Sequence, residues 1–424
     1  MIDVQSPESR ERLFEAPGIS GRWRIGLAGS VVLAMVLTAP VPRAAASDAV
    51  PAAPLPVVAP AQAGLRAERF AAIDELVAQG IRDRKLPGAV VLVGHRGQLV
   101  HRRAYGQRRV LPEAEAREMT LDTVFDLASL TKPIATATSI HRLIEQGKLE
   151  LEAPVARYLP DFAASGKEGI TIRHLLLHTS GLIPDNPIAD YALGPQKAWE
   201  NLIAIKPVSP LGEKFKYSDV NFLILGKLVE TVSGQPLDKF AREQIFAPLA
   251  MQDTGYNPDK TLLPRIAPTE KRGDSWITGF VHDPRAFALG GVAGHAGLFS
   301  TADDLAIYAQ TLLQKGEFRG KRILTPESVA RMTAPHEVPG GLRTCGWDNR
   351  SAFSGNRGTH LSDRAFGHGG FTGTGIWIDP QLELFVIFLS SRLHPSGDGA
   401  VNPLIGKVCD AAAESLGDEP PAAK

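Results

Sequence analysis

Residues 125–133 read FDLASLTKP and contain a serine, Ser129, followed three positions later by a lysine, Lys132, at the start of a helical run. Side chains three positions apart on a helix share a face, so the Lys132 amine can reach the Ser129 hydroxyl. We expect the positive end of the helix dipole to lower the pKa of Lys132 and to stabilise a nearby oxyanion. The segment therefore predicts a serine nucleophile with an adjacent amine base.

Two further segments supply the partners that this pair needs, because a chain of this length contains roughly one S-x-x-K by chance. Residues 215–221 read FKYSDVN, and the phenol of Tyr217, beside a lysine, is expected to titrate below its free value and to carry a proton. Taken singly, this tyrosine has a packed aromatic as its alternative interpretation. Residues 366–375 read FGHGGFTGTG, and glycines just before a strand let a ligand approach backbone N–H donors that can bind an oxyanion.

The composition excludes several classes of protein. The chain has 424 residues, 44% of them hydrophobic and 22% charged, which is typical of globular proteins. Lysine and arginine together number 46 and aspartate and glutamate 46, so no basic stripe offers a surface for nucleic acid. The two cysteines, Cys345 and Cys409, cannot build a disulfide scaffold or a thiolate zinc site, and whether they pair stays open.

The N-terminal segment is typical of export. Residues 1–46 contain an apolar run of about 15 residues followed by a small-residue cleavage site ending at Ala46, so we expect a cleaved signal peptide and a periplasmic or secreted protein. An uncleaved membrane anchor is the alternative, although a span needs roughly 20 apolar residues. Residues 47–64 are rich in alanine and proline and are expected to form an extended linker, and residues 418–424 a tail.

The remaining segment, residues 65–417, is expected to form one α+β domain. Strand-like patterns lie at its two ends, and helical patterns dominate between them. We therefore expect a sheet built from about residues 65–125 and 340–417, with a helical insertion over about residues 126–339. No fixed-period repeat occurs, and strands do not alternate regularly with helices, which argues against solenoids and doubly wound sheets.

The three segments in this order resemble the penicillin-binding protein and class C β-lactamase-like family of serine hydrolases, and the resemblance covers about residues 65–416. Residues 268–272 and 281–298 are similar to the exported muropeptide amidases and minor carboxypeptidase-like members of that family. The resemblance implies a five-stranded antiparallel sheet flanked by helices, beside an all-helical region, with the site in the cleft between them. It implies no cofactor and no metal, and a small-molecule or peptidoglycan-derived substrate.

The resemblance also assigns roles to individual residues. Ser129 attacks the substrate, Lys132 and Tyr217 transfer protons, and the backbone amides of Ser129 and Phe371 form the oxyanion hole. Further residues are expected to bind substrate or to support the site: Asp219, His295, His368, Gly369, Gly370, Phe371 and Arg392.

Two positions depart from the pattern of true β-lactamases. The usual Lys-Thr-Gly is replaced by His368, Gly369 and Gly370, so a permanent cation gives way to a group that is largely neutral at pH 7. Asp219 stands where the family usually has Asn, which exchanges an amide for an acceptor-only carboxylate. We therefore expect poor β-lactam hydrolysis. Arg392 is a candidate replacement cation for a substrate carboxylate, and a solvated strand end is its alternative interpretation.

The sequence thus predicts an exported serine hydrolase that forms an acyl-enzyme on an amide or ester, with a cell-wall fragment as the expected substrate. A β-lactamase or carboxylesterase of the same fold is one alternative, and a non-catalytic peptidoglycan-binding or sensor protein is another. Metal binding by His174 with His178 is disfavoured because only leucines lie between them, without the Glu of an H-E-x-x-H motif, and a core or capping role is expected instead. Metal binding by His282 with Asp283 and His295 is disfavoured because the family chemistry needs no metal. The oligomeric state stays open.

Overall fold

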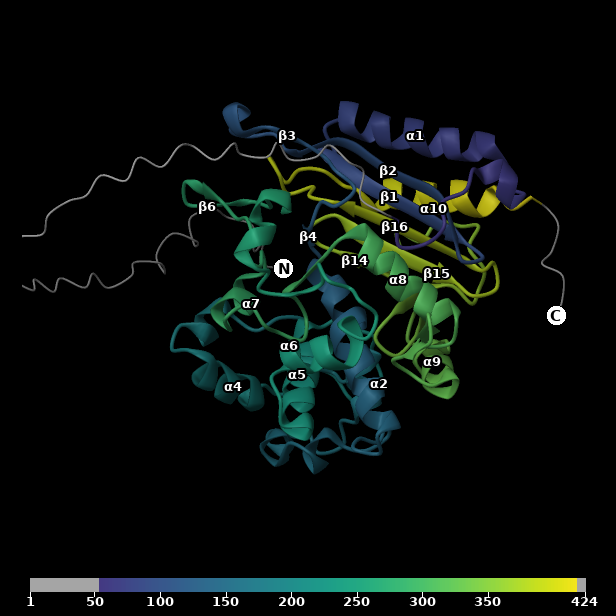
Figure 1. Ribbon diagram of the computed structural model, residues 1–424. Helices are drawn as coiled ribbons and strands as arrows, with labels where there is room; N and C mark the ends of the chain where they lie inside the picture. The colour runs from purple at the N-terminus through teal and green to yellow at the C-terminus, as the bar shows by residue number, and fades with distance from the viewer. Residues whose placement is uncertain (1–52, 418–424) are drawn as a thin grey trace, which may run out of the picture. The chain divides into compact units, whose positions relative to one another are not determined.

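The computed structural model describes residues 53–417 and contains one large antiparallel sheet (Figure 1). Two long N-terminal strands, β1 (Gly88–His95) and β2 (Gln98–Arg109), form a hairpin, and β1 also pairs with the C-terminal strand β16 (Leu384–Ser390). The sheet therefore joins the two ends of the domain. Its strand order is β11-β12-β13-β14-β15-β16-β1-β2-β3. The remaining strands are β11 (His336–Val338), β12 (Gly341–Arg343), β13 (Asp348–Arg350), β14 (Phe366–Gly370), β15 (Thr374–Asp379) and β3 (Arg117–Glu118).

The two central strands are continuous apolar runs because both faces of the sheet are covered. Alternate residues of a strand point to opposite faces. In β1, Ala89, Val91 and Val93 pack into one hydrophobic cluster, whereas Val90 and Leu92 pack into the other. The central strands therefore separate two hydrophobic cores.

Helices α1 (Ala67–Arg82) and α10 (Asn402–Glu414) cover one face of the sheet (Figure 1). Helix α1 buries Phe70, Ile73 and Val77, the face that the period of the sequence predicts. A Cβ atom at Gly80 would lie 2.8 Å from the Leu404 side chain of α10, so glycine permits the close contact between these two helices.

The helical region lies on the other face, where α8 contacts β1 and β16. Helix α5 is buried along most of its length and contacts α2, α3 and α6. The helices on this side are α2 (Thr138–Glu145), α3 (Ile172–Leu176), α4 (Pro195–Ala204), α5 (Asp219–Ser233), α6 (Leu237–Ala241), α7 (Pro284–Ala288), α8 (Ala302–Leu313) and α9 (Pro326–Thr333).

Three small sheets accompany the main one. The first has the order β4-β8-β5 and holds the residues that precede Ser129. Its strands are β4 (Phe125–Asp126), β8 (Leu298–Ser300) and β5 (Gly255–Tyr256). The other two are the hairpins β6 (Lys271–Arg272) with β7 (Ser275–Trp276), and β9 (Glu317–Phe318) with β10 (Lys321–Arg322).

The fold class agrees with the prediction, but the number of strands does not. The five-stranded sheet expected from the resemblance corresponds to β14, β15, β16, β1 and β2, and four short strands extend it to nine. Short strands of two or three residues carry too little periodic signal to be recognised in a sequence.

The beginning of the packed domain also differs from the prediction. Part of the expected linker packs on the sheet: Val57 pairs with Leu99, Leu55 is buried, and residues 60–63 form a short 3₁₀ helix. The packed domain therefore begins before residue 65. The predicted signal peptide, residues 1–46, and the tail, residues 418–424, lie outside the described residues.

Two further observations concern the cysteines and the membrane. Cys345 and Cys409 are both buried, and they are free rather than paired. Burial raises the pKa of the Cys345 thiol to about 12, so it is not a reactive thiolate.

Within residues 53–417, none of the helices combines the length and the apolar character that crossing a bilayer requires.

Candidate active site

Ser129 lies in a tight turn whose backbone is fixed by neighbouring groups. The turn is a 3₁₀ helix, η4 (Ala128–Leu130), and Ala128 has a φ of 47°, in the left-handed region that residues with a side chain rarely adopt. The buried carboxylate of Asp126 accepts hydrogen bonds from the backbone N–H groups of Ala128, at 2.9 Å, and His282, at 2.7 Å. A buried acid thus holds the strained residue next to the nucleophile.

A π-helix, η5 (Lys132–Ala137), follows this turn before α2 begins. The helical run expected from the sequence is therefore present, and it consists of a 3₁₀ turn, a π-helix and an α-helix. Single π-turns of this kind are rare and occur frequently at functional sites.

Lys132 is fully buried, and its ammonium group makes two hydrogen bonds and one ion pair. Its Nζ lies 3.0 Å from Ser129 Oγ, 3.1 Å from the backbone oxygen of His295 and 2.6 Å from Asp219 Oδ1. Burial by itself lowers the pKa of Lys132, but the attraction of Asp219 and Tyr217 raises it above the ordinary value. The predicted lowering of this pKa is therefore wrong: the lysine rests as an ammonium ion.

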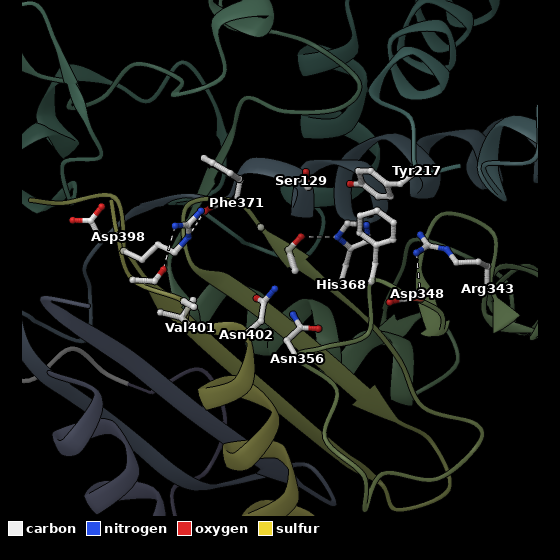
Figure 2. A pocket seen from close by; sticks show the side chains of 16 residues that line it. Ser129, Tyr217, Arg343, Asp348, Asn356, His368, Phe371, Asp398, Val401 and Asn402 are labelled. Carbon is white, nitrogen blue, oxygen red and sulfur yellow. Dashed lines mark hydrogen bonds and ion pairs between the residues drawn. The ribbon is translucent and has the colours of Figure 1, made fainter. Parts of the chain in front are cut away.

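Tyr217 and Asp219 are placed by the N-terminus of α5. Ser218 is the N-cap of this helix, and its backbone N–H donates to His178 Nδ1 at 3.1 Å. The Tyr217 ring centre lies 5.0 Å from Lys132 Nζ, and its hydroxyl points toward Ser129 (Figure 2). This placement brings the three expected catalytic residues together.

The protonation states of these two groups follow from burial and from Lys132. Burial raises the pKa of Tyr217 despite the nearby ammonium, so the predicted lowering of this pKa is also wrong and the phenol rests neutral. Burial alone would raise the pKa of Asp219, but the charge of Lys132 lowers it below its ordinary value. Asp219 is therefore an ionised carboxylate at rest.

The glycine-rich segment is tied directly to the nucleophile turn. The Thr372 hydroxyl donates to the Asp126 carbonyl at 2.7 Å, and the Thr374 hydroxyl donates to the Leu127 carbonyl at 3.2 Å. A Cβ atom at Gly370 would lie 2.4 Å from the Leu127 carbonyl oxygen, so only glycine permits this approach. These contacts fix residues 370–374 beside Ser129.

His368 and Gly369 precede this turn on β14. His368 is buried, and its Nδ1–H donates to the Gly369 carbonyl oxygen at 2.7 Å. Burial, with further contributions from Arg343 and Lys132, lowers the pKa of His368 well below its ordinary value. This strand position therefore carries a neutral imidazole, as the substitution of lysine by histidine predicts.

Arg392 anchors two loops at the edge of the site. Its Nε donates to the Phe371 carbonyl at 2.8 Å, and its Nη1 donates to the carbonyls of Gly397 and Gly399 at 3.1 and 3.2 Å. The guanidinium carbon lies 4.6 Å from the centre of the Phe371 ring, which is itself 57% exposed. The alternative interpretation of Arg392 as a solvated strand end is thereby excluded.

His295 belongs to a pair behind Lys132. Its Nε2 lies 2.9 Å from Asp283 Oδ1, and its backbone oxygen accepts the Lys132 hydrogen bond. The ligand-type atoms of Asp219, Asp283 and His295 lie within 4.8 Å of one another. Because Asp219 is paired with Lys132 and Asp283 with His295, this cluster is explained by its own ion pairs and we assign no metal to it.

A cavity of about 450 Å³ opens beside Ser129 and Tyr217 (Figure 2). Glycines 369 and 370 of the glycine-rich segment also line it. No short sequence motif marks several other residues of its wall, which come from β12, β13, the loop before β14, the loop before α10 and the first turn of α10. These residues are Arg343, Asp348, Phe353, Asn356, Asp398 and Asn402.

Comparisons with known proteins agree with this geometry. The family described as Beta-lactamase matches residues 73–409. A protein of Escherichia coli strain K12 named D-alanyl-D-alanine carboxypeptidase is 35% identical over 402 residues, which cover 85% of this chain and 91% of that protein. An N-acetylmuramyl-L-alanine amidase of Bacillus subtilis strain 168 is 34% identical over 367 residues, covering 78% and 83% respectively.

Solved structures show the same fold. A penicillin-binding protein homologue from Caulobacter crescentus superposes with a TM-score of 0.66 at 24% identity, covering 82% of this chain and 98% of that one. EstCE1, a hydrolase with promiscuous acyltransferase activity, gives a TM-score of 0.65 at 24% identity with the same coverage. The chain therefore belongs to the β-lactamase family of serine hydrolases.

Proposed function

We propose that the protein is an exported hydrolase that forms an acyl-enzyme at Ser129 and cleaves an amide bond in a peptidoglycan-derived peptide. The single observation that carries the chemistry is the 3.0 Å contact between Ser129 Oγ and the fully buried Lys132 Nζ, beside a locked glycine turn. The names of the two relatives, a carboxypeptidase and a muramyl amidase, support an amide in a cell-wall fragment.

The resting protonation states indicate how the serine loses its proton. Lys132 is an ammonium ion and cannot accept a proton until it has lost one. The ionised carboxylate of Asp219 lies 2.6 Å from Nζ and is the acceptor in direct contact. In our proposal the Lys132 ammonium passes a proton to Asp219 Oδ1 and takes the proton of Ser129 Oγ, while Oγ forms a bond to the carbonyl carbon.

The electron pair of the carbonyl π bond moves to its oxygen, and the backbone N–H groups of Ser129 and Phe371 stabilise the resulting oxyanion. When this intermediate collapses, the bond from carbon to nitrogen breaks. The leaving nitrogen takes a proton that returns from Asp219 through Lys132 and the neutral phenol of Tyr217. A water molecule then repeats the sequence on the ester and releases Ser129.

The substrate preference follows from the charge of the site. Strand position 368 carries a neutral imidazole, so it gives a β-lactam carboxylate no charge-assisted bond of the kind that lysine forms. We therefore place β-lactams below amides and esters as substrates. Export follows in this proposal from residues 1–46 acting as a cleaved signal, and intact mass of the protein recovered from the periplasm checks it.

The experiment that tests the proposed function is a side-by-side assay of the purified protein and its Ser129→Ala variant. The substrates are an N-acetylmuramyl-L-alanine peptide, a D-alanine-terminated peptide, a short-chain p-nitrophenyl ester and nitrocefin. We expect Ser129-dependent hydrolysis with one of the two peptides as the best substrate and nitrocefin orders of magnitude below it. Nitrocefin turnover near 10⁶ M⁻¹s⁻¹, on the order of a good enzyme, would make the protein a β-lactamase. Binding of the peptides without any hydrolysis would make it a sensor.

A further inference from the structure

Arg343, on β12, is a fully buried cation whose N–H groups lack acceptors. Its side chain is 0% exposed, and Nε, Nη1 and Nη2 each lack a hydrogen-bond partner within residues 53–417. The nearest acid is Asp348, whose Oδ1 lies 3.2 Å from Nη1. The aromatic ring of Phe215 lies 5.4 Å from the guanidinium carbon.

Asp348 balances the charge of Arg343 but does not satisfy its donors. The two carboxylate oxygens of Asp348 already accept bonds from the hydroxyls of Ser351 and Ser354, both at 2.7 Å, and from the backbone N–H of Asn349 at 3.0 Å. A guanidinium has five N–H donors, and leaving them unpaired in a buried place is costly. The arrangement is complete only when an acceptor from outside the chain enters.

The position of Arg343 indicates what kind of acceptor its guanidinium would bind. The residue lines the cavity that contains Ser129 and Tyr217, and Figure 2 shows its guanidinium pointing toward Tyr217 and His368. A guanidinium binds a carboxylate through two parallel hydrogen bonds, a geometry that few other groups match. Asp348 occupies one edge of the fork, so a carboxylate from the cavity would use another.

Other cations of the site are already engaged. All three donors of Lys132 are used within the chain, and two of the three nitrogens of Arg392 hold backbone carbonyls. The neutral imidazole of His368 supplies no charge. Arg343 is thus the cation of the described cavity wall whose donors remain to be used.

Phe353 lines the same cavity as Arg343, and both side chains contact Phe215. The Phe353 ring stacks on Tyr217 with ring centres 4.7 Å apart and meets Phe215 edge-on at 6.0 Å. The ring lies in the loop between β13 and β14 and is nevertheless 53% exposed. An exposed ring on a surface loop can move aside at the cost of its two contacts, with Tyr217 and with Phe215.

We propose that Arg343 binds a free carboxylate of the substrate, which reaches it when the Phe353 ring moves aside. This inference rests on the proposed function, because the carboxylate is placed relative to a bond cleaved at Ser129. It adds a requirement to that function: the peptide must carry a free carboxylate, and its carboxamide analogue should be a poorer substrate.

The first test compares two peptides that differ only in a terminal carboxylate or carboxamide, with an uncharged p-nitrophenyl ester as the control substrate. We expect the wild type to prefer the acid by at least about tenfold in kcat/KM, since a hydrogen bond to a charged group is stronger than one between neutral groups. Arg343→Gln should reduce this preference, which is a ratio measured on one protein, to about one, and Arg343→Lys, which keeps the charge but not the planar fork, should fall between. An unchanged preference in Arg343→Gln, with normal ester turnover, would overturn the proposal.

The second test does not depend on the folding of Arg343 variants or on turnover. Calorimetric titration of the Ser129→Ala protein with the same two peptides should show tighter binding of the acid, and Phe353→Ala in that background should speed association of the acid but not of the amide. Equal dissociation constants for acid and amide would refute the carboxylate site. If instead the acid binds tightly while the wild type hydrolyses neither peptide nor ester, the proposed function fails and the carboxylate site stands.

Discussion

Lys132 and Arg343 are two buried cations near Tyr217, and they differ in the contacts that their N–H groups make within the chain. Lys132 donates hydrogen bonds to the Ser129 hydroxyl and the His295 carbonyl and forms an ion pair with Asp219. Arg343 forms an ion pair with Asp348 but makes no hydrogen bond within residues 53–417, although both cationic side chains are 0% exposed. Lys132 thus belongs to a site whose contacts are made within the chain, whereas in our proposal Arg343 gains its hydrogen bonds from a substrate carboxylate.

The comparison also shows that a partner, not a motif, decides the protonation state of the lysine. An S-x-x-K segment predicts an amine with a lowered pKa, and burial alone would have that effect. Asp219, 87 positions further along the chain, reverses it through a contact of 2.6 Å. We therefore expect the pKa of Lys132 to fall when asparagine replaces Asp219.

The largest effect is expected where the complete site is broken. Lys132→Ala and Tyr217→Phe should each reduce kcat by about 10³–10⁴, and the double variant should be little worse than either, because groups that act as one unit are non-additive. Steady-state kinetics on the best peptide check this, with the exposed Lys227→Ala on α5 as the matched control. Losses that add on the logarithmic scale would assign Lys132 and Tyr217 independent roles.

The next effect concerns the tie between the glycine turn and the nucleophile. A Cβ at Gly370 would lie 2.1 Å from Thr374 Oγ1 and 2.4 Å from the Leu127 oxygen, so Gly370→Ala must displace the turn that carries the Phe371 amide. Losing one oxyanion donor costs about 10²–10³ in kcat. Gly355→Ala, where a Cβ meets nothing within 4 Å, is the control and should keep wild-type activity. Full activity in Gly370→Ala would remove Phe371 from the oxyanion hole.

Asp219→Asn should change the pH profile more than the maximum rate. In the wild type the pKa of Asp219 is lowered, so its carboxylate is available as acceptor above that pKa and kcat/KM should fall only in acid. With asparagine, burial lowers the pKa of Lys132, and the rate should rise with pH as the free amine forms. At neutral pH we expect a loss of about 10–100-fold, within the range for one proton-transfer group. Identical acid limbs in both proteins would contradict the role of Asp219.

The smallest effect is expected on stability. It is measured as the free energy of unfolding of variants that remove either Lys132 or Arg343. Lys132→Met leaves the Asp219 carboxylate buried without its partner, and breaking such a pair costs about 3–5 kcal/mol in the free energy of unfolding. Arg343→Met removes a guanidinium held by one ion pair and leaves Asp348 with its three hydrogen bonds, so we expect a smaller loss than for Lys132→Met. Urea unfolding followed by circular dichroism measures both. Equal losses would mean that Arg343 is satisfied in the free protein.

Much of the fold could be predicted because its signals are local. The apolar runs of β1 and β16 and the helical period of Phe70, Ile73 and Val77 are visible in the sequence and are confirmed. The short strands β11 to β13 have too few residues for a period to show. The packing of residues 53–64 could not be predicted either, since their alanine and proline composition is typical of linkers.

The site was predictable only as far as its motifs extend. Ser129, Lys132 and Tyr217 stand in three recognisable segments, and the structure brings them together. The segment around Arg343 contains no recognisable motif. The role of Arg343 could not be predicted, because it depends on contacts with residues far away in sequence, such as Phe215. The pKa directions of Lys132 and Tyr217 were predicted wrongly because burial and the Asp219 contact are properties of the folded chain.

The central claim is that Ser129 becomes acylated, and one measurement tests it most directly. The protein is treated with a fluorophosphonate or a slowly deacylating ester, digested, and analysed by mass spectrometry, with Ser129→Ala treated in parallel. The account predicts one adduct, on the peptide that contains Ser129, and none in the variant. An adduct on Ser180, Ser218 or Ser300, or an equal adduct in Ser129→Ala, would contradict it.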